Sequence, residues 1–162
     1  MLIFISGSIN AGKTTTSKFL AEKLGWTNIN VDDLIDNVEG FDIYTHLDVA
    51  MDLAIEAVNA ATDAGNNVVA NFVIRKEDYA RFEHEIHAQP QVFITLSPGL
   101  KAAQSQRGNR VLSAWEIKRI KAHHDDGIAA PEYGHIIDNS NLTVEETANK
   151  IIELVTAHHS LK

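Results

Sequence analysis

One eight-residue stretch near the start of the chain limits its fold more than any other feature. Residues Gly7 to Thr14 read G-S-I-N-A-G-K-T, which matches the pattern G-x-x-x-x-G-K-[ST] of phosphate-binding loops. An apolar run at 2–5 precedes the loop, and a helical apolar pattern over 13–24 follows it and ends at Gly25. Strand, glycine loop and helix in this order are the context that the motif requires, so we expect a nucleotide phosphate site here.

The chemistry of this loop follows from its residue types. Glycines at both ends of the loop let the backbone approach an anion without a Cβ in the way. Backbone N–H groups and the positive end of the following helix then face the phosphates, and Lys13 reaches the phosphate oxygens. The hydroxyl of Thr14 is the expected Mg²⁺ ligand. We therefore predict an ATP–Mg²⁺ site formed in this region by Gly7, Ser8, Asn10, Ala11, Gly12, Lys13, Thr14 and Thr15.

Length and charge narrow the class of protein further. The 162 residues predict a single domain, 1–162. The 14 basic residues against 22 acidic ones give a net charge of −8, which disfavours nucleic acid or an anionic membrane as partner. No run of residues reads as a signal peptide or reaches the ~18 apolar residues of a membrane helix. The chain has no cysteine, which excludes thiolate chemistry and fits a cytoplasmic protein. We expect a monomer or a homodimer.

Apolar, β-rich runs alternate with helical patterns along the chain. We expect strands at 2–5, 28–31, 68–74, 92–96 and 135–137. We expect helices at 13–24, 45–64, 76–88, 99–106, 113–126 and 143–159, the last two opening with capping boxes at Ser113–Glu116 and Thr143–Glu146. This alternation predicts an α/β fold whose parallel sheet is covered by helices on both faces. Ligands bind such sheets beyond the carboxyl ends of the strands, so functional residues should follow each strand.

Two aspartates follow the second predicted strand. Asp32 or Asp33 could take the proton of an attacking hydroxyl, orient an acceptor molecule or hold Mg²⁺. The alternative without a function is a helix start, since aspartate is common in caps and first turns.

With this loop and these aspartates, the chain resembles the small P-loop kinases that phosphorylate metabolite hydroxyls. That group includes shikimate kinase, gluconate kinase, adenylylsulfate kinase and chloramphenicol phosphotransferase. The resemblance covers nearly the whole chain, and the loop is its most diagnostic motif. It implies a three-layer fold with a five-stranded parallel sheet in the order 2-3-1-4-5, and transfer of the γ-phosphoryl group of ATP to a small-molecule hydroxyl. Matching Leu34-Ile35-Asp36 to the family's motif places Asp32 at the catalytic, acceptor-binding position, with Asp33 as the alternative.

The segment that builds the acceptor site in this family corresponds to about 33–66. No lysine or arginine occurs from 24 to 74, whereas nine acids lie between 32 and 63. A nucleoside monophosphate or an organic acid needs cations in its site, so the composition favours a neutral or cationic acceptor. The alternative is that these acids form a solvated helix face.

The third predicted strand ends with an unusual residue. Asn71 stands where many of these kinases carry a Walker B-type aspartate, and an amide is a weaker anchor for water around Mg²⁺. Arg75 follows, and it either holds the acceptor or a phosphate, or begins the next helix as a surface charge. Both are candidates for substrate binding.

Arginines follow the fourth strand. In the family the corresponding segment, 107–112 here, is a lid that closes over the transferring phosphoryl group, so Arg107 and Arg110 are expected to be catalytic, and Arg107 also to bind the nucleotide. The alternative is a solvated charged turn. Asn139, after the fifth strand, lies in a stretch that resembles the family's adenine-proximal loop. His123 and His124 we interpret as the polar end of a helix.

Two other functions stay open at this point. A nucleotide kinase needs cations in the acceptor segment, and 24–74 has none. An ATP-binding regulatory protein without transfer chemistry would be compatible with Asn71 in place of an acid.

Overall fold

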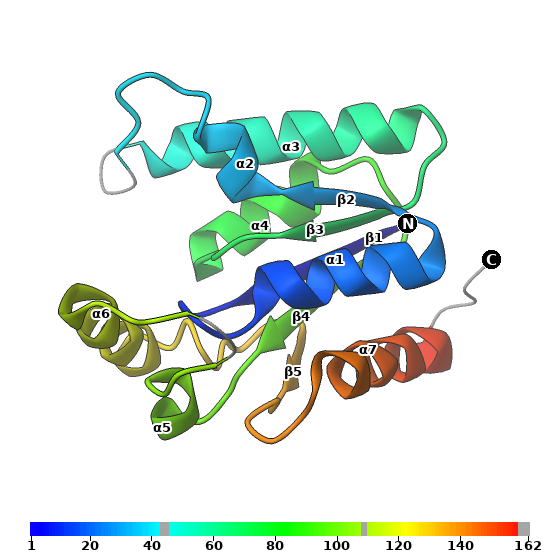
Figure 1. The fold of residues 1–162 in the computed structure, drawn as a ribbon. Coiled ribbons are helices and arrows are strands. Elements are labelled where there is room, and N and C mark those ends of the chain that lie inside the picture. Colours follow the sequence, from blue (N-terminus) through cyan, green and yellow to red (C-terminus); the bar gives the residue numbers. More distant parts are fainter. Residues whose placement is uncertain (43–45, 108–109, 159–162) are drawn as a thin grey trace.

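Five parallel strands form one sheet with β1 at its centre (Figure 1). The structure, a computed structural model, describes residues 1–42, 46–107 and 110–158. The strand order is β2-β3-β1-β4-β5, which confirms the predicted order. The strands are β1 Leu2–Gly7, β2 Thr27–Asn30, β3 Val68–Asn71, β4 Gln91–Leu96 and β5 His135–Ile137.

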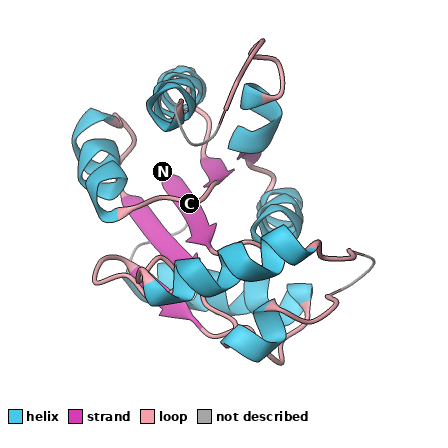
Figure 2. Ribbon diagram, turned by 90° about the vertical axis from the view of Figure 1, so that its left-hand side faces the viewer, coloured by secondary structure: helices cyan, strands magenta, loops and turns pink. Residues whose placement is uncertain are grey.

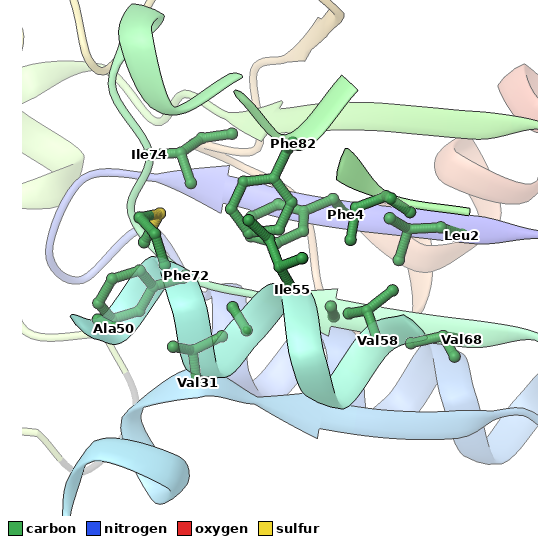
Figure 3. Close-up of a cluster of buried hydrophobic side chains, with 14 of the residues drawn as sticks. Leu2, Phe4, Val31, Ala50, Ile55, Val58, Val68, Phe72, Ile74 and Phe82 are labelled. Carbon is green, nitrogen blue, oxygen red and sulfur yellow. The ribbon is translucent and has the colours of Figure 1, made fainter. Parts of the chain in front are cut away.

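The central strand explains how the sheet holds two helical layers. All six residues of β1 are buried, and successive side chains of a strand point to opposite faces. Leu2 and Phe4 belong to the apolar cluster on one face, whereas Ile3 and Ile5 belong to the cluster on the other. Figure 3 shows the first cluster, in which Phe4 lies beside Phe82 with ring centroids 4.9 Å apart. A fully apolar strand of this kind is buried on both sides, as parallel sheets require.

Helices cover both faces of the sheet, as the alternating pattern predicted (Figure 2). Side chains of α3 and α4 pack in the cluster with Phe4, and side chains of α1 and α7 pack in the cluster with Ile3. The shorter α2 follows β2, and α5 and α6 lie between β4 and β5. The helices are α1 Lys13–Leu24, α2 Val31–Ile35, α3 Leu47–Asp63, α4 Lys76–Glu85, α5 Leu100–Ala103, α6 Ala114–Asp125 and α7 Val144–His158.

Several helix ends lie where the sequence placed them. Gly25 ends α1 in the left-handed conformation, with φ of 68°, and its N–H contacts the carbonyls of the last turn. The Ser113 hydroxyl accepts from the Glu116 N–H at 3.2 Å, while the Glu116 carboxylate accepts from the Ser113 N–H at 2.8 Å, which completes the predicted capping box. The predicted limits Thr45 and His159 lie outside the described residues.

The second strand ends one residue earlier than predicted, because Val31 begins α2. This helix was not among the predicted ones, but a helix start was the alternative interpretation of Asp32 and Asp33, and both lie in its first turn. Val31 and Ile35 lie one helical turn apart and both enter the core beside α3. The short helix therefore turns the chain directly at the carboxyl end of β2, where Asp32 lies in its first turn.

Three other predicted elements are too long. The pairing of β3 ends at Asn71, and 72–74 leave the sheet. The helix α4 ends at Glu85 rather than at 88, because Ile86 continues in an extended conformation and is buried. The helix α5 is a single turn, since the Asn10 side chain binds the carbonyls of Ala103 and Ser105. No helix in the described ranges is both long and apolar enough to cross a membrane.

Candidate active site

The phosphate-binding loop joins β1 to α1 and adopts a backbone that only glycine tolerates at its first residue. Gly7 has φ of 141°, and a Cβ placed on it would lie 2.4 Å from the carbonyl oxygen of Leu96 on β4. Gly12 has φ of 94° at the start of α1. Both backbone conformations would be strained for a residue with a side chain. The two motif glycines are therefore required by the backbone path, as predicted.

Side-chain amides hold this loop in place from two sides. Asn10 has φ of 61°, and its Nδ2 donates to the carbonyls of Ala103 at 2.8 Å and Ser105 at 3.0 Å. Asn139, after β5, donates from Nδ2 to the carbonyl of Ala11 at 2.9 Å. The loop is therefore tied both to the segment that leads into the lid and to the loop that follows β5.

Lys13 is the first residue of α1, and its side chain folds back onto the loop. Its Nζ donates to the Ser8 carbonyl at 3.0 Å. Burial lowers the pKa of Lys13 to about 8, and the neighbouring Asp32 opposes this shift while Arg110 adds to it. Within the described part of the chain, no side chain caps the first turn of α1, so its backbone N–H groups stay available to an anion. Loop, lysine and helix end together form an anion site.

A cavity of about 680 Å³ opens in front of this loop, a size in the range of small-molecule sites. It brings together candidates from four separate parts of the chain: the phosphate loop, the start of α2, the lid and the loop after β5. The predicted residues in its wall are Asn10, Gly12, Lys13, Thr14, Thr15, Asp32, Arg107, Arg110 and Asn139.

The cavity distinguishes between Asp32 and Asp33, the two candidates for the catalytic position that the sequence left open. Asp32 lines it, keeps contact with solvent and has a pKa raised chiefly by partial burial, an effect that Lys13 opposes. Asp33 is not among the lining residues, and its carboxylate accepts from Asn30 Nδ2 at 2.8 Å. The geometry therefore favours Asp32 as the carboxylate that faces a ligand.

Two predicted substrate-binding residues lie elsewhere. The side chain of Arg75 binds Asp78 through two hydrogen bonds of 2.9 and 2.8 Å and also pairs with Glu77, in the wall of a second cavity of about 570 Å³. Asn71 is fully buried beneath α1 and is absent from the main cavity wall. The structure thus corrects the expectation that either residue faces the acceptor beside Lys13. No described residue of 33–66 lines the main cavity.

Both predicted lid arginines line the cavity, whereas Gly108 and Asn109 between them lie outside the described residues. Arg110 forms an ion pair with Glu116 at the start of α6. Arg107 donates from Nη2 to the carbonyl of Asn139 at 2.9 Å. Its Nη1 and the Oδ1 of Asn139 are buried without a partner in the described structure. Buried polar atoms of this kind normally bind something, so this end of the cavity fits a polar ligand such as a nucleotide base.

One wall of the cavity was not predicted. Trp115, Arg119 and His123 line it from α6. Their spacing of four places them on one face of the helix, which is the signal that the sequence offered. His123 is only 4% exposed, and burial together with the charges of Arg119 and Lys13 lowers its pKa to about 4. His123 does lie in the last turn of α6, as interpreted, but it is buried in the cavity wall, which the sequence did not predict.

Arg119 also changes the inference about acceptor charge. The absence of cations from 24–74 favoured a neutral or cationic acceptor, on the assumption that this segment forms the site. In the structure α6 supplies a cation to the cavity instead. An acceptor with a negative group is therefore compatible with the cavity.

The residues present fit a magnesium ion only together with a nucleotide. The Thr14 hydroxyl and the Asp32 carboxylate offer the oxygen ligands that Mg²⁺ prefers. No group of three or more histidine, aspartate or glutamate side chains in the described part of the chain could hold a metal ion. Mg²⁺ usually keeps several waters and binds one or two protein groups plus substrate phosphates. The sparse ligand set agrees with that mode.

The sheet order, the phosphate loop and the cavity define the class of P-loop nucleotide-binding proteins that includes the small kinases. The profile of the family described as chloramphenicol phosphotransferase-like protein matches residues 1–156. The chain therefore belongs to the chloramphenicol phosphotransferase-like family, and with it to the small P-loop kinases.

Similar proteins agree with this assignment. The shikimate kinase of Synechococcus elongatus is 50% identical over 38 residues, which are 24% of this chain and 20% of that protein, so the match spans a fifth of the relative. The structure of shikimate kinase from Acinetobacter baumannii in complex with shikimate has a TM-score of 0.70 at 20% identity, covering 99% of this chain and 95% of that one. A gluconokinase from Sinorhizobium meliloti 1021 has a TM-score of 0.68 at 12% identity, covering 96% and 95%. At these identities the superpositions show the fold alone.

Proposed function

We propose that the protein is an ATP- and Mg²⁺-dependent phosphotransferase that moves the γ-phosphoryl group to a hydroxyl of a small-molecule acceptor. The observation that carries this proposal is that one cavity joins the phosphate loop with Lys13 to the carboxylate of Asp32. A nucleotide site without transfer chemistry would use a carboxylate there only to help hold Mg²⁺. A transferase needs one to handle the proton of the attacking hydroxyl.

In the proposed reaction, the acceptor hydroxyl oxygen forms a bond to the γ-phosphorus while the bond from that phosphorus to the β–γ bridging oxygen breaks. The hydroxyl proton passes to Asp32, and ADP leaves. Lys13 and the lid arginines Arg107 and Arg110 neutralise the charge on the phosphoryl oxygens during transfer. Thr14 and Asp32 would hold a bound Mg²⁺, which supplies further neutralisation of phosphate charge.

The acceptor lies, in this proposal, between Asp32 and the α6 wall. Phe72 and Val73, which follow β3, also line the cavity. Trp115 offers an aromatic surface, while Arg119 and His123 offer polar contacts. This arrangement suits a hydroxyl compound with an apolar or planar body and a polar or anionic group.

The test follows the label from γ-labelled ATP, with Mg²⁺, into a fractionated metabolite extract. We expect label on a small molecule with the wild-type protein and with Asp33→Asn. With Asp32→Asn we expect a rate at least about 100-fold lower, as for loss of a general base. Asp33→Asn is a matched control, because it makes the same charge change one residue away and outside the cavity.

Three results would overturn the proposal. Label that stays on ATP in every fraction, with ATP binding confirmed, would indicate a regulatory nucleotide-binding protein. Label on nucleoside monophosphates would indicate a nucleotide kinase. Equal rates for Asp32→Asn and Asp33→Asn would remove Asp32 from the reaction.

A further inference from the structure

A buried amide lies directly beneath the predicted metal ligand. Asn71 is the last residue of β3 and is fully buried, and it pairs in register with Ile5 on β1 and Asn30 on β2. Its side chain points at α1 and contacts two hydroxyl side chains there, Thr14 and Ser17. Of these two, Thr14 lines the cavity, whereas Ser17 is fully buried.

Three hydrogen bonds determine where each proton in this group lies. Ser17 Oγ donates to the Thr14 backbone carbonyl at 3.1 Å, because a carbonyl oxygen can only accept. Having donated its proton, the Ser17 hydroxyl accepts from Asn71 Nδ2 at 2.8 Å. The amide oxygen Oδ1 therefore faces Thr14. It too can only accept, so the Thr14 hydroxyl donates to it, at 3.4 Å.

The reversed amide would disturb this arrangement. It would place Oδ1 against Ser17, whose single hydroxyl proton would then have to leave the Thr14 carbonyl. The observed orientation keeps this hydrogen bond and gives the Asn71 amide, the Ser17 hydroxyl and the Thr14 hydroxyl a partner each. Ser17 thus fixes the orientation of the Asn71 amide.

The consequence is an oriented hydroxyl. With its proton directed at Asn71, the Thr14 oxygen turns its lone pairs away from β3. We propose that Asn71 is a positioning residue that, held by Ser17, aims the Thr14 hydroxyl oxygen at a nucleotide-bound Mg²⁺. This inference rests on the proposed ATP–Mg²⁺ site, and it assigns Asn71 a role at the metal without contact to the acceptor. The 3.4 Å separation is long for a hydroxyl hydrogen bond, and such contacts often tighten when a ligand binds.

The neutral amide has a distinct chemical signature. Its oxygen accepts the hydrogen bond from the Thr14 hydroxyl as a carboxylate would, but it brings no negative charge to the metal. A carboxylate at 71 would accept the same hydrogen bond from Thr14 and attract the cation in addition, while the Ser17 hydroxyl would turn its proton to the second carboxylate oxygen. The coupling between Mg²⁺ and nucleotide should therefore decrease when the amide is removed and increase when it becomes an acid.

The experiment measures ADP binding by calorimetry, with Mg²⁺ and with EDTA, for each variant. The ratio of Kd in EDTA to Kd in Mg²⁺ gives the metal factor. We expect Asn71→Ala to lower this factor about 3- to 10-fold, the worth of one hydrogen bond, and to change Kd in EDTA by less than about twofold. Ser17→Ala should lower the factor in the same direction, and Asn71→Asp should raise it above the wild-type value.

Asn59→Asp is the matched control. Asn59 on α3 also uses both amide atoms, donating to the Glu85 carbonyl at 2.9 Å and accepting from the His87 N–H at 2.8 Å, but it lines neither cavity described here. Asn59→Asp makes the same chemical change away from the predicted metal site, so the metal factor should stay at the wild-type value. Melting curves of each variant establish that it is folded.

Several outcomes would overturn the inference. A metal factor near one in the wild type would mean that no protein group couples the metal to the nucleotide. An unchanged metal factor in folded Asn71→Ala or Ser17→Ala would exclude the positioning role. A variant that loses as much ADP affinity in EDTA as in Mg²⁺ would have a distorted loop instead. If Asn71→Ala does not fold, Ser17→Ala and Asn71→Asp decide the question. None of these measurements needs phosphoryl transfer, so a failed acceptor search would leave the inference intact.

Discussion

Raising the pH from 7 to 9 should weaken ADP binding about tenfold, because the lysine of the phosphate loop loses its charge in this range. Burial lowers the pKa of Lys13 to about 8 in the free protein. Its Nζ contacts the Ser8 carbonyl, which stabilises the ammonium only in part. The phosphates of a bound nucleotide bring negative charge to the same place, so the pKa of Lys13 rises on binding.

The magnitude follows from this difference. At pH 7 about nine in ten free molecules carry a charged Lys13, and at pH 9 about one in ten does. Binding selects the charged form, so at pH 9 each binding event takes up about one proton. Below pH 7 the lysine is charged in both states, and the affinity should no longer depend on its titration.

Calorimetry in buffers of different ionisation enthalpy measures both the affinity and the proton uptake. Lys13→Met should bind weakly at every pH and without the extra proton. Lys18→Met, on the exposed side of α1, should keep the full pH dependence. An affinity that stays within about twofold from pH 7 to 9, with no proton uptake, would refute the reasoning, because Lys13 would then not titrate against a bound phosphate.

Other changes have effects that stability measurements can check. Gly7→Ala should lower the free energy of unfolding by about 3 kcal/mol or more, because the new Cβ meets the β4 backbone at 2.4 Å, whereas Gly25→Ala, also left-handed but in open space, should cost about 1 kcal/mol. Equal melting temperatures would contradict this. Asn139→Ala should cost about 1–3 kcal/mol and weaken nucleotide binding, since it leaves a phosphate-loop carbonyl unpaired; binding at wild-type affinity would argue against the anchor. Ser113→Ala should cost about 1 kcal/mol in urea unfolding through loss of the α6 cap. The Ser113 N–H, with a further contribution from Arg110, lowers the pKa of Glu116 to about 2. The free energy of unfolding that Glu116→Gln removes should therefore be largest above pH 4.5 and disappear as the pH falls to 2. A difference from the wild type that persists at pH 2 would indicate lost packing instead.

The features that the sequence predicted are those set by local chemistry. The phosphate loop needs glycine where φ is positive, and a search for this pattern finds it directly. Capping boxes such as Ser113 with Glu116 depend on residues three apart, so they too are readable from the chain. The order of the strands came from the family resemblance, since hydrophobic period carries no information on which strands are neighbours.

Most of the features that the sequence missed depend on contacts between distant segments. The pairing of β3 stops at Asn71 although the apolar run continues to Ile74, because the chain leaves the sheet to form the cavity wall. Arg75 follows a strand as a ligand-binding residue would, but Asp78 and Glu77 bind its guanidinium. His123 does lie in the last turn of a helix, but it is buried in the wall of the cavity. Packing between distant segments decided the outcome for β3 and His123, whereas Arg75 is held by side chains two and three residues further along the chain.

The two ends of the cavity are formed by different kinds of protein group. The phosphate end is formed by the backbone of the loop, on a path that depends on Gly7 and Gly12, together with Lys13 and Thr14. The α6 end consists of side chains, at Trp115, Arg119 and His123. In the proposed function, replacing these three residues on one face of α6 would change the acceptor surface and leave the phosphate loop unaltered. This division offers a route by which one scaffold acquires new acceptors through few substitutions, and it makes α6 the place to begin when its selectivity is to be redesigned.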